Sequence, residues 1–156
     1  MILTEPTIQA RFGRRLRRRA LDAFLDEAAA AVKIRGEVAA LLTTDAEIRR
    51  LNRTFRKKNK RTDVLSFPAA EPLRGQEPTG GDLAISVETA ARQAAEAGHA
   101  LSVELQVLLL HGVLHLAGYD HERDTGQMAA RETLLRRRFG LEAGLIERAA
   151  RNGGRQ

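Results

Sequence analysis

Three of the chain's four histidines, His111, His115 and His121, lie within eleven residues of one another. The first two are four residues apart in an apolar, helix-favouring segment, so they share one helix face and lie about 6 Å apart along its axis. Two imidazoles in this arrangement can bind one metal ion. Gly118 favours the end of the helix, because glycine adopts the left-handed conformation at little cost. The chain can then turn back and bring His121 to the same ion.

Three neutral imidazoles and one water form an open tetrahedral zinc site, which is typical of catalytic zinc. A closed structural site has four protein ligands, often cysteines, and this chain contains no cysteine. A single histidine on an apolar helix is more often a hydrogen-bonded core residue, but three at this spacing around a glycine favour a metal. The sequence therefore predicts one Zn²⁺ per chain, bound by His111, His115 and His121. His99 follows Gly98 in an expected helix–helix loop and is interpreted as an ordinary loop residue.

The spacing of these histidines equals that of the metzincin proteases, H-E-x-x-H-x-x-G-x-x-H. Gly112 occupies the position at which such a protease has its general-base glutamate. Without this carboxylate, the zinc-bound water has no proton acceptor for peptide cleavage, although the ion can still lower the pKa of that water. We therefore expect chemistry other than ordinary peptide hydrolysis.

The composition is that of one globular domain of 156 residues, with a hydrophobic content of 43%. No segment approaches the roughly 20 apolar residues of a membrane span, and no signal peptide is recognisable, so we expect a cytoplasmic protein with no membrane partner. The formal net charge of +6 favours a polyanionic partner such as RNA. Most of the basic residues are arginines, a bias that can also reflect genome base composition, so the charge alone leaves RNA binding open.

The histidine-bearing helix belongs to an expected α+β fold, a single domain over residues 1–156. Strands are expected near residues 38–43, 63–67 and 82–86, with a further one within residues 1–8 that Pro6 would confine to a sheet edge. These form a small mixed β-sheet of about four strands packed by about five or six helices, with the metal site on the central histidine-bearing helix and the loop after it. We expect residues 1–15 to be a basic leader and residues 152–156 to fray. The arginine-rich run 11–19 is either solvated, which we favour, or an RNA contact.

Polar residues mark the starts of three expected helices. Thr44 and Glu47 form a capping box that starts a helix at Asp45, Ser86 caps a helix over residues 87–97, and Ser102 caps the histidine-bearing helix. Further helices are expected near residues 16–33, 126–139, where Met128, Leu134 and Leu135 pack inward, and 141–150.

Residues 56–61, R-K-K-N-K-R, form a basic segment between the helix that starts at Asp45 and the strand near 63–67. A run of charges is usually a solvated surface. The alternative is that the run binds RNA phosphates through Lys57, Lys58, Lys60 and Arg61. Its position between two ordered elements makes this alternative more credible. The proline- and glycine-rich residues 71–81 are expected to form a long surface loop.

With these residues assembled, the chain resembles the YbeY family of bacterial endoribonucleases, which are ribosomal RNA maturation factors. The family signature H-G-x-L-H-L-x-G-Y-D-H is intact over residues 111–121, a second block matches Asn52-x3-Arg56 with residues 62–68, and a third matches residues 81–86. The resemblance runs in order from about residue 37 to 122. Arg61 stands where many members have a proline, a difference that we expect to change loop stiffness and not chemistry.

The resemblance implies a single-strand-specific, zinc-dependent endoribonuclease that acts in small-subunit ribosomal RNA processing and ribosome quality control. It implies His111, His115 and His121 as metal ligands and Arg56 as an active-site arginine, so His111 and Arg56 are the candidate catalytic residues. The expected partners are RNA, in particular small-subunit ribosomal RNA, and the ribosome, and no DNA is expected. Zinc can activate water or hold a phosphate oxygen, and the planar fork of Arg56 can neutralise charge that develops on the phosphate.

Two other functions remain open. One is a metzincin-like zinc hydrolase of peptides or small esters that lacks the usual glutamate, against which Gly112 argues. The other is a ribosome-associated RNA-binding factor whose zinc is structural, with Asp120 closing the site as a fourth ligand. Asp63, Asp120 and Glu104 are also candidate partners for imidazole N–H groups, although local caps and salt bridges are the simpler interpretation.

Overall fold

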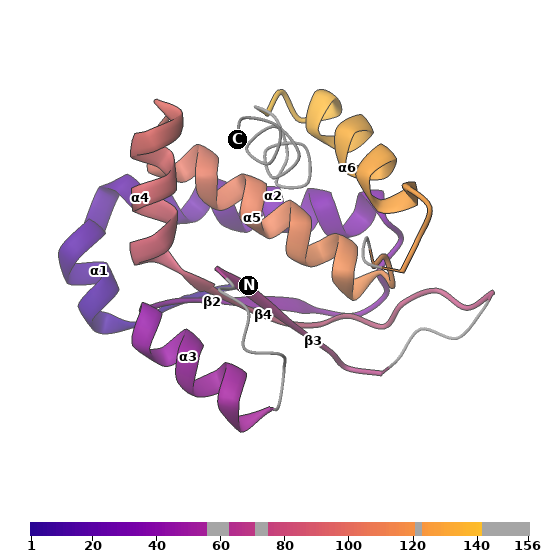
Figure 1. The fold of residues 1–156 in the computed structure, drawn as a ribbon, viewed down its shortest axis with the longest axis horizontal. Coiled ribbons are helices and arrows are strands. Elements are labelled where there is room, and N and C mark those ends of the chain that lie inside the picture. The colour runs from indigo at the N-terminus through magenta and orange to yellow at the C-terminus, as the bar shows by residue number, and fades with distance from the viewer. Residues whose placement is uncertain (56–62, 71–74, 121–122, 142–156) are drawn as a thin grey trace.

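The structure is a computed structural model that describes residues 1–55, 63–70, 75–120 and 123–141. Figure 1 shows its elements, which are listed here in chain order. They are β1 (Ile2–Thr4), α1 (Pro6–Phe12), the 3₁₀ helix η1 (Gly13–Leu16), α2 (Arg18–Ala31), β2 (Val38–Thr43), α3 (Asp45–Thr54), β3 (Val64–Pro68), β4 (Gly81–Ser86), α4 (Val87–Ala97), α5 (Leu101–Leu116) and α6 (Gln127–Arg138). The predicted α+β class is confirmed, with a mixed four-stranded sheet and six α-helices within the described ranges. Residues 142–150 of the helix predicted over 141–150, the tail 152–156 and residues 71–74 of the predicted loop lie outside these ranges.

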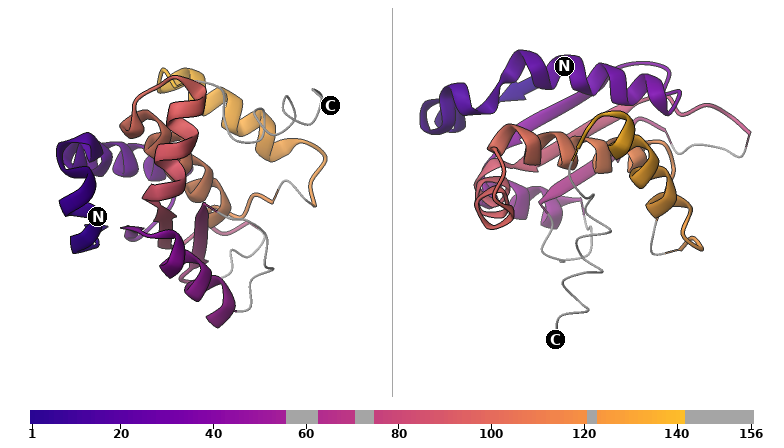
Figure 2. Two further views of the ribbon diagram at one scale, coloured as in Figure 1. Left: turned by 60° about the vertical axis from the view of Figure 1, so that its left-hand side comes forward. Right: turned by 90° about the horizontal axis from the view of Figure 1, so that it is seen from above.

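The sheet has the strand order β1-β2-β4-β3. Strand β2 runs parallel to both β1 and β4, whereas β3 is antiparallel to β4. Successive side chains of a strand point to opposite faces, and both faces of this sheet are covered. Val64, Leu83 and Ile85 join the main core on one face, while Leu65 and Ala84 pack with Ile48 of α3 on the other. Helices α2 and α5 lie side by side over the first face, and α3 lies beneath the second (Figures 1 and 2).

Helix α5 is the central helix of this domain. Twelve of its sixteen residues are buried, because it packs against the sheet and also against α2, α4 and α6. A helix that is apolar on every side is stable only in such an enclosed position. The histidine-bearing segment is therefore enclosed by its neighbours and held in place.

No single helix in the described part of the chain is long and apolar enough to cross a membrane, although α4 and α5 together, bent by 115°, reach that length and composition.

The N-terminal region differs from its prediction. The first strand is at the sheet edge as expected, but it ends at Thr4, and Pro6 begins helix α1. Proline is favoured at the first position of a helix, where its missing N–H is not needed. The expected basic leader is instead folded, since residues 1–16 form β1, α1 and η1 and bury Ile2, Ile8 and Leu16 in the core.

Two smaller predictions about helices are wrong. Ser102 does not cap α5, because the helix begins one residue earlier, at Leu101, with Ala100 at the N-cap and no side-chain cap. In α6, Met128 and Leu135 are buried as predicted, but Leu134 is 58% exposed and faces away from the core.

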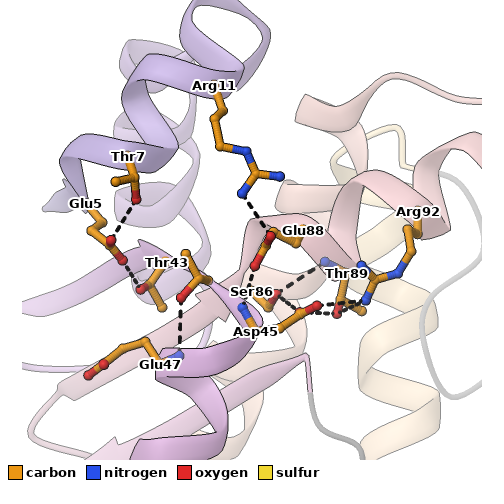
Figure 3. A network of polar contacts seen from close by, with 11 residues as sticks. Glu5, Thr7, Arg11, Thr43, Asp45, Glu47, Ser86, Glu88, Thr89 and Arg92 are labelled. Atoms are coloured by element: carbon orange, nitrogen blue, oxygen red, sulfur yellow. Dashed lines mark hydrogen bonds and ion pairs between the residues drawn. The ribbon is translucent and has the colours of Figure 1, made fainter.

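The predicted caps of α3 and α4 are present and belong to one polar network (Figure 3). Thr44 Oγ1 accepts from the Glu47 amide at 3.2 Å, and Ser86 Oγ accepts from the Thr89 amide at 3.2 Å. The side chain of Glu47 pairs with Arg50, so only one half of the predicted capping box is seen in these contacts.

Asp45, the first residue of α3, connects the two helix starts (Figure 3). Its carboxylate accepts hydrogen bonds from the Ser86 hydroxyl, from Thr89 Oγ1 at 2.6 Å and from Arg92 Nη2 at 3.0 Å. Glu88 of α4 accepts in return from the Asp45 amide at 2.8 Å. Partial burial, the largest single effect, raises the pKa of Asp45, but the hydrogen bonds from Ser86, Thr89 and Arg92 together outweigh it and lower the pKa to about 2. The carboxylate therefore fixes α3 against α4.

Candidate active site

His111 and His115 lie on the C-terminal half of α5 and point toward each other. Their Nε2 atoms are 3.2 Å apart, and their rings are inclined at 73° with centroids 4.8 Å apart. Two nitrogens bound to one tetrahedral zinc, each about 2.0–2.1 Å from the ion, would be roughly 3.3–3.4 Å apart. The two side chains are neighbours on one helix face, as the i, i+4 spacing predicted, and the separation of their donor atoms would fit a single shared zinc ion.

Gly118 ends the helix as predicted. Its φ of +98° is left-handed, and the Tyr119 amide donates to the Leu114 carbonyl at 3.1 Å while the Gly118 amide donates to the His115 carbonyl at 3.0 Å. This pair of bonds is the Schellman motif, which reverses the chain after a helix. The turn comes three residues before His121, the third predicted ligand, which lies outside the described residues. Within the described part of the chain, no three histidine, aspartate or glutamate side chains form a metal-binding group.

Glu132 of α6 is a site residue that the sequence analysis missed. The Nδ1–H group of His111 donates to Glu132 Oε2 at 3.1 Å, and Glu132 is only 2% exposed. The sequence did carry a signal, since residues 128, 132 and 135 follow the i, i+4, i+7 spacing of one helix face. A glutamate on the same face as Met128 and Leu135, both buried, needs a polar partner, because acidic side chains are almost never fully buried without one.

Gly112 has a packing role that the sequence did not reveal. A Cβ atom at this position would lie 2.8 Å from Leu83 Cδ2, 3.0 Å from Leu83 Cδ1 and 3.2 Å from Val64 Cγ2. The glycine thus allows α5 to approach β3 and β4 closely. A side chain at position 112 would enter the layer between helix and sheet, so a glutamate here would be directed into the core.

His99 and Glu104 form a second buried pair, separate from His111 and His115. His99 Nε2–H donates to Glu104 Oε1 at 2.8 Å, and both side chains are at least nine-tenths buried. His99 does lie in the predicted loop between α4 and α5, but its side chain is buried and paired, unlike that of an ordinary loop residue. Glu104 therefore does accept from an imidazole, but from that of His99 and not from His111 or His115. Asp120 forms a salt bridge of 3.5 Å with Arg123. Asp63 Oδ2 is buried and has no hydrogen-bond partner among the described residues.

The remaining predicted site residues, Arg56, Lys57, Lys58, Lys60 and Arg61, lie outside the described residues. The positions that flank them are anchored on the sheet. Phe55 makes an edge contact with Phe67 of β3, with ring centroids 5.0 Å apart, and the Asp63 carbonyl accepts from the Ser86 amide of β4 at 2.9 Å.

A family model described as Endoribonuclease YbeY matches residues 4–140. The chain belongs to this family. It is 51% identical over 131 residues to Endoribonuclease YbeY of Koribacter versatilis, which covers 84% of this chain and 83% of the relative. It is 50% identical over 146 residues to Endoribonuclease YbeY of Solibacter usitatus, with 94% and 86% covered.

The YbeY family assignment agrees with a similarity of fold. A solution structure of a protein from Thermotoga maritima is 28% identical, covers 85% of each chain and superimposes with a TM-score of 0.54. The resemblance drawn from the sequence motifs is thus confirmed, and the matched residues extend beyond the motifs, from the last residue of β1 to the second residue after α6.

Proposed function

We propose that this chain is a zinc-dependent endoribonuclease that cleaves single-stranded RNA, and that it acts in small-subunit ribosomal RNA processing and ribosome quality control. The observation that supports the metal most directly is the 3.2 Å separation of the Nε2 atoms of His111 and His115. Membership of the YbeY family supports the RNA substrate. The proposed location is the cytoplasm, where the ribosome is the expected partner.

His111, His115 and His121 would hold one Zn²⁺ per chain. When bound, the ion supplies a Lewis acid that stabilises negative charge and lowers the pKa of water. The chain's own contribution begins with α5, whose enclosure by the core keeps the two imidazoles in place without further ordering. Gly118 then reverses the chain so that the third ligand can follow only six residues after the second.

Arg56 is the proposed partner of the substrate phosphate. Cleavage of a phosphodiester develops negative charge on the phosphate oxygens, and a guanidinium can neutralise it through two parallel hydrogen bonds. Lys57, Lys58, Lys60 and Arg61 would bind neighbouring phosphates of the strand, consistent with the net charge of +6. None of these roles requires a glutamate at position 112.

The test combines metal analysis with RNA cleavage. We expect purified protein to contain one zinc per chain and to cleave a single-stranded RNA but not its duplex, with activity lost on chelation and restored by Zn²⁺. His115→Ala should lose both zinc and cleavage. His99→Gln is the matched control, because His99 pairs with Glu104 and not with His111 or His115. This variant should retain both zinc and RNA cleavage.

Three results would contradict the proposal in different ways. Wild-type protein without any divalent metal would remove the zinc site. Cleavage that survives complete removal of zinc would remove its catalytic role. One tightly bound zinc per chain without RNA cleavage would instead support an RNA-binding factor with a structural metal.

A further inference from the structure

Two buried glutamate–histidine pairs involve α5. The first, Glu104 with His99, joins residues five apart at the start of the helix. The second, Glu132 with His111, joins residues 21 apart and connects α6 to α5. Burying a carboxylate is strongly unfavourable unless it is paired and hydrogen-bonded. The first pair is a local contact at a helix start, whereas the second lies directly behind the proposed metal site.

The atoms of the second pair bear on metal binding. A neutral imidazole carries one hydrogen, and the bond to Glu132 places it on Nδ1, which leaves the lone pair on Nε2. This Nε2 is the atom that lies 3.2 Å from His115 Nε2. The bond also fixes the rotation of the His111 ring, and a carboxylate at this position makes the imidazole a stronger ligand.

The other oxygen of Glu132 supports a dedicated role. Oε1 is buried and has no hydrogen-bond partner among the described residues. The contact with His111 is therefore what offsets the burial of this carboxylate. If α6 needed only to pack against α5, an apolar residue at position 132 would have a smaller desolvation cost than a glutamate. Met128 and Leu135 on the same face are such residues.

We propose that Glu132 is a positioning residue for the metal site: it selects the His111 tautomer that binds zinc and raises the affinity for the ion. This inference rests on the proposed function, because it assigns a role toward the same zinc. Through Glu132, helix α6 would contribute to the metal site. Residues 117–126 connect α5 to α6 and include His121, and the pair holds the far end of this connection against α5.

The test is zinc affinity, measured by competition with a chromophoric chelator. Glu132→Gln keeps the size of the side chain and one acceptor but removes the charge, and we expect zinc affinity to fall by roughly 10- to 100-fold. Glu132→Ala should lower it at least as much. The matched control is Glu104→Gln, which removes an equally buried carboxylate from the other histidine pair on the same helix and should leave zinc affinity unchanged. Thermal unfolding of each variant shows how much stability it has lost.

A spectroscopic measurement separates positioning from general destabilisation. With Co²⁺ in place of zinc, the visible absorption bands should change in Glu132→Gln and not in Glu104→Gln. In metal-free wild-type protein, the ring ¹⁵N signals of His111 should show the hydrogen on Nδ1, a check that needs no variant to fold.

If the wild-type chain binds one zinc and Glu132→Gln binds it equally tightly, this inference is overturned and the proposed function remains intact. An equal loss of affinity in Glu104→Gln would also overturn it, as would a His111 hydrogen found on Nε2. Absence of zinc binding by the wild-type protein would instead refute the proposed function itself.

Discussion

Replacing Gly112 by alanine should destabilise this protein, although alanine is the better helix former. In an exposed helix interior the substitution would stabilise by about 1 kcal/mol. Here the added Cβ would lie 2.8 and 3.0 Å from the terminal carbons of Leu83 and 3.2 Å from Val64 Cγ2. Both neighbours are buried core residues packed between helix and sheet, so they cannot simply rotate away.

The net magnitude follows from these two opposing effects. Overpacking of a well-filled core costs about 1–3 kcal/mol, from which the gain in helix propensity of about 1 kcal/mol is subtracted. We therefore expect Gly112→Ala to lower the free energy of unfolding by about 1 kcal/mol, or the Tm by about 2–4 °C for a chain of this length. Gly112→Glu, which restores the glutamate of the metzincin pattern, should cost far more and yield no peptidase, because its carboxylate would be buried without a partner.

The assay is urea denaturation of Gly112→Ala, Leu83→Ala and the double variant. Leu83→Ala alone should cost about 2–5 kcal/mol, because it leaves a cavity in the core. In that background the added methyl enters the vacated space, so Gly112→Ala should become neutral or stabilising. If Gly112→Ala instead stabilises the wild-type protein by about 1 kcal/mol, and has the same effect when Leu83 is replaced by alanine, then Leu83 does not crowd position 112. A folded Gly112→Glu variant with peptidase activity would be equally damaging.

Three further predictions concern charge. Asp45→Asn should lower the free energy of unfolding by about 1–2 kcal/mol at pH 7, after allowance for solvent screening of a partly exposed group. Because the folded pKa of Asp45 is lowered to about 2, this contribution is present above the unfolded value near 3.8 and is lost as the pH falls toward 2, so equal differences from wild type at pH 7 and pH 2 would contradict it. Arg56→Ala should reduce single-turnover RNA cleavage at saturating enzyme by roughly 10²-fold, with little change in zinc content or Tm. Arg56→Lys should not restore the rate. If Arg56→Ala cleaves at the wild-type rate at saturating enzyme, Arg56 is a binding residue only. Replacing Lys57, Lys58 and Lys60 together by alanine should weaken RNA binding and flatten its dependence on salt, whereas an unchanged slope would indicate a solvated surface.

The proximity of His111 and His115 and the end of α5 at Gly118 were readable from the sequence because their determinants are local. The spacing of His111 and His115 on one helix face depends only on the helical repeat, and the stop at Gly118 depends on the conformation of one residue. The caps at Thr44 and Ser86 are local for the same reason, since each bonds an amide three residues away. Such features are fixed within one helical turn, whatever surrounds them.

Where two local preferences compete, the sequence was less informative. Pro6 is compatible with an edge strand and with the first turn of a helix, and only the pairing of β1 with β2 decides that the strand ends before it. Ser102 is a good capping residue, but the turn at Gly98 and the extended Ala100 start α5 two residues too early for Ser102 to be the N-cap.

The contacts that join distant segments were decided by the tertiary structure alone. Glu132 meets His111 because α6 packs across α5, and the composition of α6 does not specify which residue it will face. Gly112 reads in the sequence as a missing glutamate, whereas the packed sheet makes it the position at which α5 touches Leu83 and Val64. Burial and long-range pairing depend on how whole elements are placed against each other, and that placement follows from the sum of many weak apolar contacts, not from any short pattern of residues.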